Sequence, residues 1–142
     1  MIKQENIRFR LEENHFGKLL GLISDQIEAG LAVCRMPITP ALTNPYGFAQ
    51  GGSLVSFADA TMALALVYLD EAVTTNDIQY HFTEGIRLGA VARCEARVVK
   101  EGRKLVTLEA RVYAQAGTEA RLIGLSTATY YRLGRPMLPE ER

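Results

Sequence analysis

Residues 44–69, NPYGFAQGGSLVSFADATMALALVYL, decide the fold of this chain. The first part predicts a loop, because Pro and Gly interrupt regular structure and the pair Gly51-Gly52 allows close approach to the backbone. From Ser53, the expected N-cap, apolar residues recur at helical spacing as far as Leu69. Because the segment 53–69 is apolar almost all round, we expect a helix that is buried on most sides.

Asp59 is the single charged residue of this predicted helix. It lies about two turns from the helix start, too far to act as a cap. An isolated helical carboxylate is usually solvated or paired with an arginine. Here, free N–H groups at the helix start would stabilise developing negative charge, which favours a hydrolytic pair of carboxylate and oxyanion site. The face of Asp59 carries only small residues, which leave room for a ligand or a second chain: Gly52, Ser56, Ala60 and Ala63.

The length of 142 residues fits a single domain spanning residues 1–142. The formal net charge is zero, so no overall field attracts nucleic acid or an anionic membrane. Cys34 and Cys94 have apolar or small neighbours and no CxxC spacing, which predicts buried free thiols. The N-terminal segment lacks the apolar core of a signal peptide, and no uninterrupted apolar run reaches membrane-spanning length. We therefore expect a cytoplasmic protein without a membrane segment.

The other elements follow from periodicity and turn residues. We expect a helix at 3–20, a hairpin at 22–38 with Pro37 suggesting an edge strand, alternating strands at 73–83, 90–100, 104–115 and 121–133, and a loose tail at 134–142. A sheet with one apolar face must cover that face, and only the helix at 53–69 is apolar enough. The predicted fold is therefore α+β, a curved antiparallel sheet wrapped around one long central helix.

The charges on two of these strands predict their register. The apolar faces of 90–100 and 104–115 must match, so paired residues must have numbers of the same parity. One such register places Arg97 opposite Glu109 and Glu95 opposite Arg111. A shift by two residues would set Glu95 against Glu109, and facing like charges are unfavourable. We therefore predict the first register.

Several motifs resemble the hotdog-fold acyl-CoA thioesterases of the phenylacetic-acid-degradation, or PaaI-like, type. The resemblance extends from about residue 17 to residue 132. Its motifs are Asn44, Gly47, the turn Gln50-Gly51-Gly52, Asp59 seven residues further on, the run Thr74-Thr75-Asn76-Asp77-Ile78 and the turn Gly102-Arg103. It implies hydrolysis of an acyl-CoA to free acid and CoA, without a metal or a redox cofactor, at a site between two chains of a dimer or a dimer of dimers.

The resemblance also implies residue roles. Asp59 would be the general base or the nucleophile, Asn44 would hold the attacking water or the acid, and Thr75 would help to position the water. The backbone N–H of Gly51 would receive the thioester oxygen. Gln50 stands where the family usually has a histidine; glutamine keeps hydrogen-bonding capacity but cannot carry a proton near neutral pH.

Further candidates concern the substrate. Coenzyme A phosphates are usually met by basic residues at the mouth of the site, for which Arg103 and Lys104 are the candidates. The identity of the acyl group does not follow from the sequence. The remaining candidates for substrate binding are Gly52, Tyr46, Phe48 and Met62.

Two other functions are alternatives to hydrolysis. A non-catalytic acyl-CoA sensor would not need Asp59, although Gln50 slightly favours it. A hydratase or dehydratase acting on acyl thioesters usually needs a catalytic histidine, and neither His15 nor His81 lies near the glycine turn. The sequence has no G-x-S-x-G elbow and no phosphate-binding glycine motif, and a serine triad or a histidine metal site is disfavoured.

Overall fold

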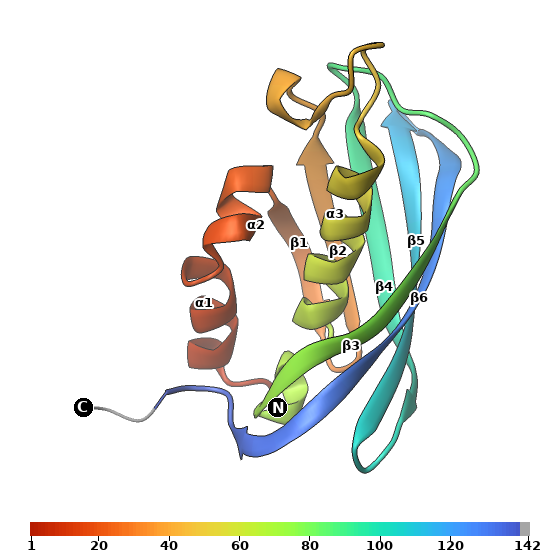
Figure 1. Ribbon diagram of the computed structural model, residues 1–142. Helices are drawn as coiled ribbons and strands as arrows, with labels where there is room; N and C mark the ends of the chain where they lie inside the picture. The colour runs from red at the N-terminus through yellow and green to blue at the C-terminus, as the bar shows by residue number, and fades with distance from the viewer. Residues whose placement is uncertain (140–142) are drawn as a thin grey trace.

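The computed structural model describes residues 1–139 and shows a curved antiparallel sheet wrapped around one long helix (Figure 1). The helices are α1 (Gln4–Glu12), α2 (His15–Leu20) and α3 (Gly51–Leu64), with the short 3-10 helices η1 (Pro40–Leu42) and η2 (Val67–Leu69). The strands are β1 (Ile23–Glu28), β2 (Leu31–Pro37), β3 (Glu71–Phe82), β4 (Val91–Glu101), β5 (Leu105–Ala116) and β6 (Glu119–Pro136). This architecture is the hotdog fold and confirms the predicted class.

The six strands follow the order β1-β2-β4-β5-β6-β3, and every neighbouring pair is antiparallel. The chain leaves α3 and enters the sheet at its far edge, so β3 pairs with β6 on one side only. The predicted hairpin is confirmed as β1 and β2. The expectation of an edge strand at Pro37 is wrong, because β2 lies between β1 and β4. Pro37 is tolerated there because it is the last residue of its strand.

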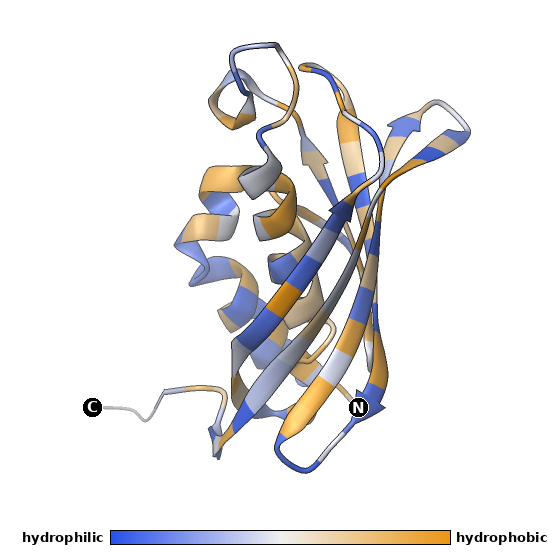
Figure 2. Cartoon of the chain, turned by 45° about the vertical axis from the view of Figure 1, so that its right-hand side comes forward, coloured by the Kyte–Doolittle hydropathy of each residue, from blue (hydrophilic) through white to orange (hydrophobic). Residues whose placement is uncertain are grey.

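The predicted register of β4 and β5 is confirmed. Arg97 lies opposite Glu109, and Glu95 lies opposite Arg111. Polar and apolar residues alternate along the strands, which is visible as bands of colour in Figure 2. Because the side chains alternate between the two faces, the apolar residues of neighbouring strands share one face of the sheet, and this face lies towards the helix.

The core lies between α3 and the inner face of the sheet. Phe57, Ala58 and Met62 of α3 are fully buried. The facing residues of β4 are small, which lets the helix lie close to the sheet: Ala92, Cys94 and Ala96. Cys34 lies directly opposite Cys94, yet both thiols are free and buried, as predicted. Burial raises the pKa of Cys34 to about 11, so this thiol stays protonated at neutral pH.

The central helix differs from its prediction at both ends. It begins at Gly51 rather than after Ser53, and Gln50 is its N-cap. Ser53 instead donates its hydroxyl to the Gln50 carbonyl at 2.7 Å. The helix proper ends at Leu64, and η2 continues the chain to Leu69. Although Gly51–Leu69 has the length and hydropathy of a membrane span, more than half of its residues are buried inside this fold, as expected for a core helix.

The chain termini also depart from expectation. The single helix predicted at 3–20 is two helices, because Asn14 caps α2 by accepting the N–H of Gly17 at 3.0 Å. Both helices lie beside α3, on the side away from the sheet (Figure 1). The predicted loose tail is wrong for residues 134–136, which belong to β6, and Met137 is buried. Residues 140–142 of that tail lie outside the described residues.

Candidate active site

The loop before α3 is organised by Asn44. Its side-chain oxygen accepts the backbone N–H groups of Tyr46 at 2.9 Å and Phe48 at 3.1 Å. Gly47 takes a positive φ of 82°, which completes the tight turn at little steric cost. The oxygen of Asn44 is therefore engaged in shaping the loop. Only its amide N–H groups remain available for the water-holding or acid-holding role that the resemblance implies.

The start of α3 presents free backbone donors. Gln50 has an extended conformation, its side chain is exposed, and it makes no capping hydrogen bond. Gly51 is the first helical residue, so its N–H has no acceptor within the helix. A Cβ on Gly51 would come within 3.1 Å of the Phe82 ring, whereas a side chain on Gly52 would point into open space. Glycine at 51 therefore lets the Phe82 ring pack against the helix start.

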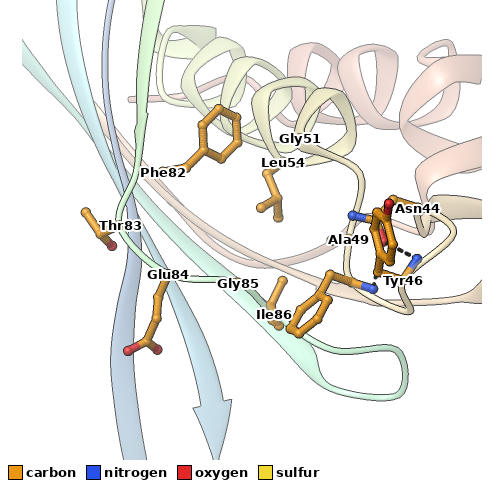
Figure 3. A pocket seen from close by; sticks show the side chains of 11 residues that line it. Asn44, Tyr46, Ala49, Gly51, Leu54, Phe82, Thr83, Glu84, Gly85 and Ile86 are labelled. Atoms are coloured by element: carbon orange, nitrogen blue, oxygen red, sulfur yellow. Dashed lines mark hydrogen bonds between the residues drawn. The ribbon is translucent and has the colours of Figure 1, made fainter.

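A cleft of about 620 Å³ opens beside this helix start (Figure 3). Its walls come from the loop before α3, from the first turns of α3 and from the segment after β3. An Arg87 guanidinium lies over the Phe48 ring, 4.7 Å from the centroid, and so places a cation next to the cleft. The lining residues are Asn44, Tyr46, Phe48, Ala49, Gly51, Leu54, Phe82, Thr83, Glu84, Gly85 and Ile86.

Asp59 belongs to a second cluster. Thr75 donates its hydroxyl to Asp59 Oδ1 at 2.8 Å. The Tyr130 hydroxyl lies within hydrogen-bonding distance of the same Oδ1 and is 2.8 Å from the backbone oxygen of Asp59. Arg10 of α1 is half-buried nearby: burial lowers its pKa, and the charges of Tyr130 and Asp59 act in the opposite direction. The cluster thus joins α1, α3, β3 and β6.

Within one chain, the predicted residues fall into separate groups. The cleft brings together Asn44, Tyr46, Phe48 and Gly51, with Gln50 and Gly52 beside them, but neither Asp59 nor Thr75 lines it. Arg103 and Lys104 lie in the turn between β4 and β5, at the opposite end of the molecule from the loop before α3 (Figure 1).

The structure adds information on two residues, Met62 and Tyr130. We expected Met62 to line a pocket, but it is fully buried in the core. Tyr130 was missed, although alternation along its strand places it on the inner face, where a tyrosine hydroxyl needs a polar partner. Among residues 1–139, no group of three or more His, Cys, Asp or Glu side chains is arranged to hold a metal ion.

Comparisons with known proteins agree with this fold. Among the solved structures that resemble it is a thioesterase family protein from Silicibacter pomeroyi, with TM-score 0.82 and 28% identity over 91% of this chain and 96% of that one. Another is the E. coli PaaI protein from the phenylacetic acid degradation operon, with TM-score 0.87 and 22% identity over 93% of this chain and 94% of that one. At 22% identity, the second likeness shows the fold alone.

The family assignment rests on sequence. The family model described as thioesterase superfamily matches residues 46–121, more than half of the chain, and the chain belongs to this superfamily. The acyl-coenzyme A thioesterase THEM4 of Xenopus laevis is 36% identical over 76 residues, which are 53% of this chain and 34% of that protein. The match therefore covers about a third of that relative's length.

Proposed function

We propose that this chain hydrolyses an acyl-CoA thioester to a free acid and CoA, with Asp59 as the essential carboxylate. The observation that carries the proposal is the setting of Asp59. It is the only charged residue of α3, and two hydroxyl groups lie against its Oδ1 atom. Its other oxygen, Oδ2, accepts no hydrogen bond from residues 1–139 and is free to meet a substrate or a water. Membership of the thioesterase superfamily supports the same activity.

The reaction assigns a task to each group. Asp59 takes a proton from water while the water oxygen bonds to the thioester carbon. The carbonyl oxygen then carries the negative charge, which the N–H of Gly51 at the helix N-terminus stabilises. Collapse of this intermediate breaks the carbon–sulfur bond and CoA leaves as the thiolate, which takes up the proton that Asp59 accepted and so restores the carboxylate. If Asp59 attacks the carbonyl directly, an anhydride forms first and water then hydrolyses it.

The proposed site requires two chains. Asp59 and Gly51 lie on the same helix, but Asp59 is not part of the cleft that Gly51 lines. β3 is an edge strand of 12 residues with mostly exposed polar side chains, and an unpaired edge of this length is a template for another strand. We propose a homodimer, or a dimer of dimers, in which Asp59 of one chain faces the glycine turn of the next. Light scattering that finds a stable, active monomer would contradict this assembly.

An acyl-CoA panel tests the activity directly. The purified protein is incubated with acyl-CoAs of short, long, branched and aromatic acyl groups, and the released thiol is measured. The proposal predicts thiol release in equal amount to free acid for at least one substrate. Binding of acyl-CoA without any thiol release would favour the alternative function, a sensor domain, for which the glutamine at position 50 is the supporting observation.

Two substitutions of Gln50 test whether its side chain takes part in the reaction. If it acts by hydrogen bonding, Gln50→Ala should lower turnover about tenfold, because loss of one transition-state hydrogen bond costs about 1.4 kcal/mol. Gln50→His should preserve turnover. The side chain is exposed and caps nothing, so neither variant should change the free energy of unfolding appreciably. Unchanged turnover in the alanine variant would show that Gln50 has no part in the reaction.

A further inference from the structure

We infer that Tyr130 is a positioning residue for Asp59, which its hydroxyl holds in the conformation that the reaction uses. The inference rests on the proposed function, because it concerns the carboxylate assigned to the hydrolysis. The resemblance described above assigns no role to this tyrosine. It follows from the way in which β3 and β6 meet α3.

Tyr130 and Thr75 reach Asp59 from neighbouring strands. The two residues are direct partners in the β3–β6 ladder, so their side chains share one face of the sheet. That face is the inner one, and Asp59 lies above it on α3. The register shifts immediately after Thr75, between Thr75 and Asp77, and such a bulge redirects the side chains of its strand.

The two hydroxyls converge on a single carboxylate oxygen. Thr75 donates to Asp59 Oδ1 at 2.8 Å, and the Tyr130 hydroxyl lies against the same atom and 2.8 Å from the Asp59 backbone oxygen. A carboxylate held at one oxygen from two directions cannot rotate freely about its side-chain bonds. Oδ2 is thereby presented in one direction, and small misplacements of a reacting group lower rates strongly.

Tyr130 acts as a fixed donor rather than as an acid or a base. Its side chain is 1% exposed. Burial, followed by the charge of Asp59 and the hydrogen bond to it, raises the pKa of Tyr130 well above its ordinary value. The hydroxyl therefore keeps its proton at neutral pH. Arg10 is the cation that faces this cluster, and the other neighbours of Asp59 there are hydroxyl groups.

The alternative is a purely structural role, in which Tyr130 only links α3 to the sheet by its hydrogen bond to the Asp59 backbone oxygen. A structural tie of this kind would affect stability and would leave turnover of the folded protein unchanged. Positioning predicts the opposite, a loss in kcat that the folded state does not explain. Tyr130→Phe separates the two because it keeps the buried ring and removes only the hydroxyl.

The test compares Tyr130→Phe with Tyr131→Phe, the same change at the next residue of the strand, where the side chain is 39% exposed. We expect kcat of Tyr130→Phe to fall about 10- to 100-fold with KM within about twofold of wild type. Tyr131→Phe should keep wild-type kcat. Crystal structures of wild type and Tyr130→Phe should show Asp59 in one rotamer in the first and in several, or a different one, in the second.

Each outcome decides the inference. Wild-type kcat in Tyr130→Phe overturns it, and so does an Asp59 side chain that keeps its single rotamer without the hydroxyl. If Asp59→Asn itself keeps full turnover, the proposed function fails instead, and the rotamer of Asp59 in the Tyr130→Phe crystal still decides whether Tyr130 positions it. A loss of unfolding free energy with unchanged kcat would leave Tyr130 a structural tie and would also overturn the inference.

Discussion

Asp59→Asn should lower turnover by about 10²- to 10⁴-fold if Asp59 is the general base, and by more if it is the nucleophile. The amide oxygen can take the place of Oδ1 and accept the hydroxyls of Thr75 and Tyr130. The amide NH₂ then replaces Oδ2, the oxygen that accepts nothing from the described residues. The substitution therefore removes the basic atom while keeping the local hydrogen bonds, and the protein should fold normally.

The measurement is steady-state hydrolysis of the best acyl-CoA, together with calorimetric binding of the same acyl-CoA to both proteins. Binding should survive in Asp59→Asn, since the substitution leaves the cleft beside Gly51 untouched. Asp25→Asn is the matched control. Asp25 lies on β1, the edge strand at the other side of the sheet from β3, and pairs there with Arg35 of β2. A folded Asp59→Asn protein with near-wild-type turnover would refute the role of this carboxylate.

Gly51→Pro should lower turnover by about 10²- to 10³-fold, the usual effect of removing one oxyanion donor. Proline lacks the backbone N–H, and at this position the fold can accept it. Gly51 is the first residue of α3, where proline is favoured, and Gln50 before it has φ −61° and ψ 135°, which suits a following proline. The N–H of Gly51 has no backbone acceptor among residues 1–139, so its loss breaks no backbone hydrogen bond of the described chain.

Gly51→Ala separates the N–H from the added bulk. Both variants bring a Cβ to about the position that lies 3.1 Å from the Phe82 ring, but alanine keeps the N–H. Phe82 is 54% exposed and can shift slightly, so the alanine variant should lose little stability. Turnover should therefore fall far more in Gly51→Pro than in Gly51→Ala. Equal losses in the two would assign the effect to crowding of the cleft and would count against an oxyanion role.

The fold was predictable because its determinants are local and repetitive. Alternation along β4 and β5 requires matching apolar faces, and charge disfavours the shift by two residues that would set Glu95 against Glu109; the register that pairs Glu95 with Arg111 is present. The apolar composition of α3 identified the central helix. Its first residue was misplaced because the sequence suggested a side-chain cap at Ser53, whereas Gln50 occupies the N-cap without any side-chain hydrogen bond.

The site was predictable only in part, because its contacts join residues far apart in the chain. Asp59 was singled out as the lone charge of an apolar helix and Thr75 came from the resemblance, and the structure joins the two by a hydrogen bond. Alternation places Tyr130 on the inner face but does not reveal which helical residue it meets, 71 positions away. Met62 is one of the apolar residues that recur at helical spacing in α3. This spacing alone does not distinguish a core residue from a residue that lines a pocket. Periodicity likewise carries no signal for how two chains pair.

Subunit complementation tests the central claim, that Asp59 and the glycine turn of two different chains form one site. Asp59→Asn and Gly51→Pro proteins are purified, unfolded together, refolded and assayed for thiol release. In a mixed dimer, the intact Asp59 of one chain meets the intact Gly51 of the other at one of the two sites. Random pairing should therefore restore roughly a quarter of wild-type turnover from two nearly inactive proteins. A mixture no more active than the sum of its two components would contradict the shared site.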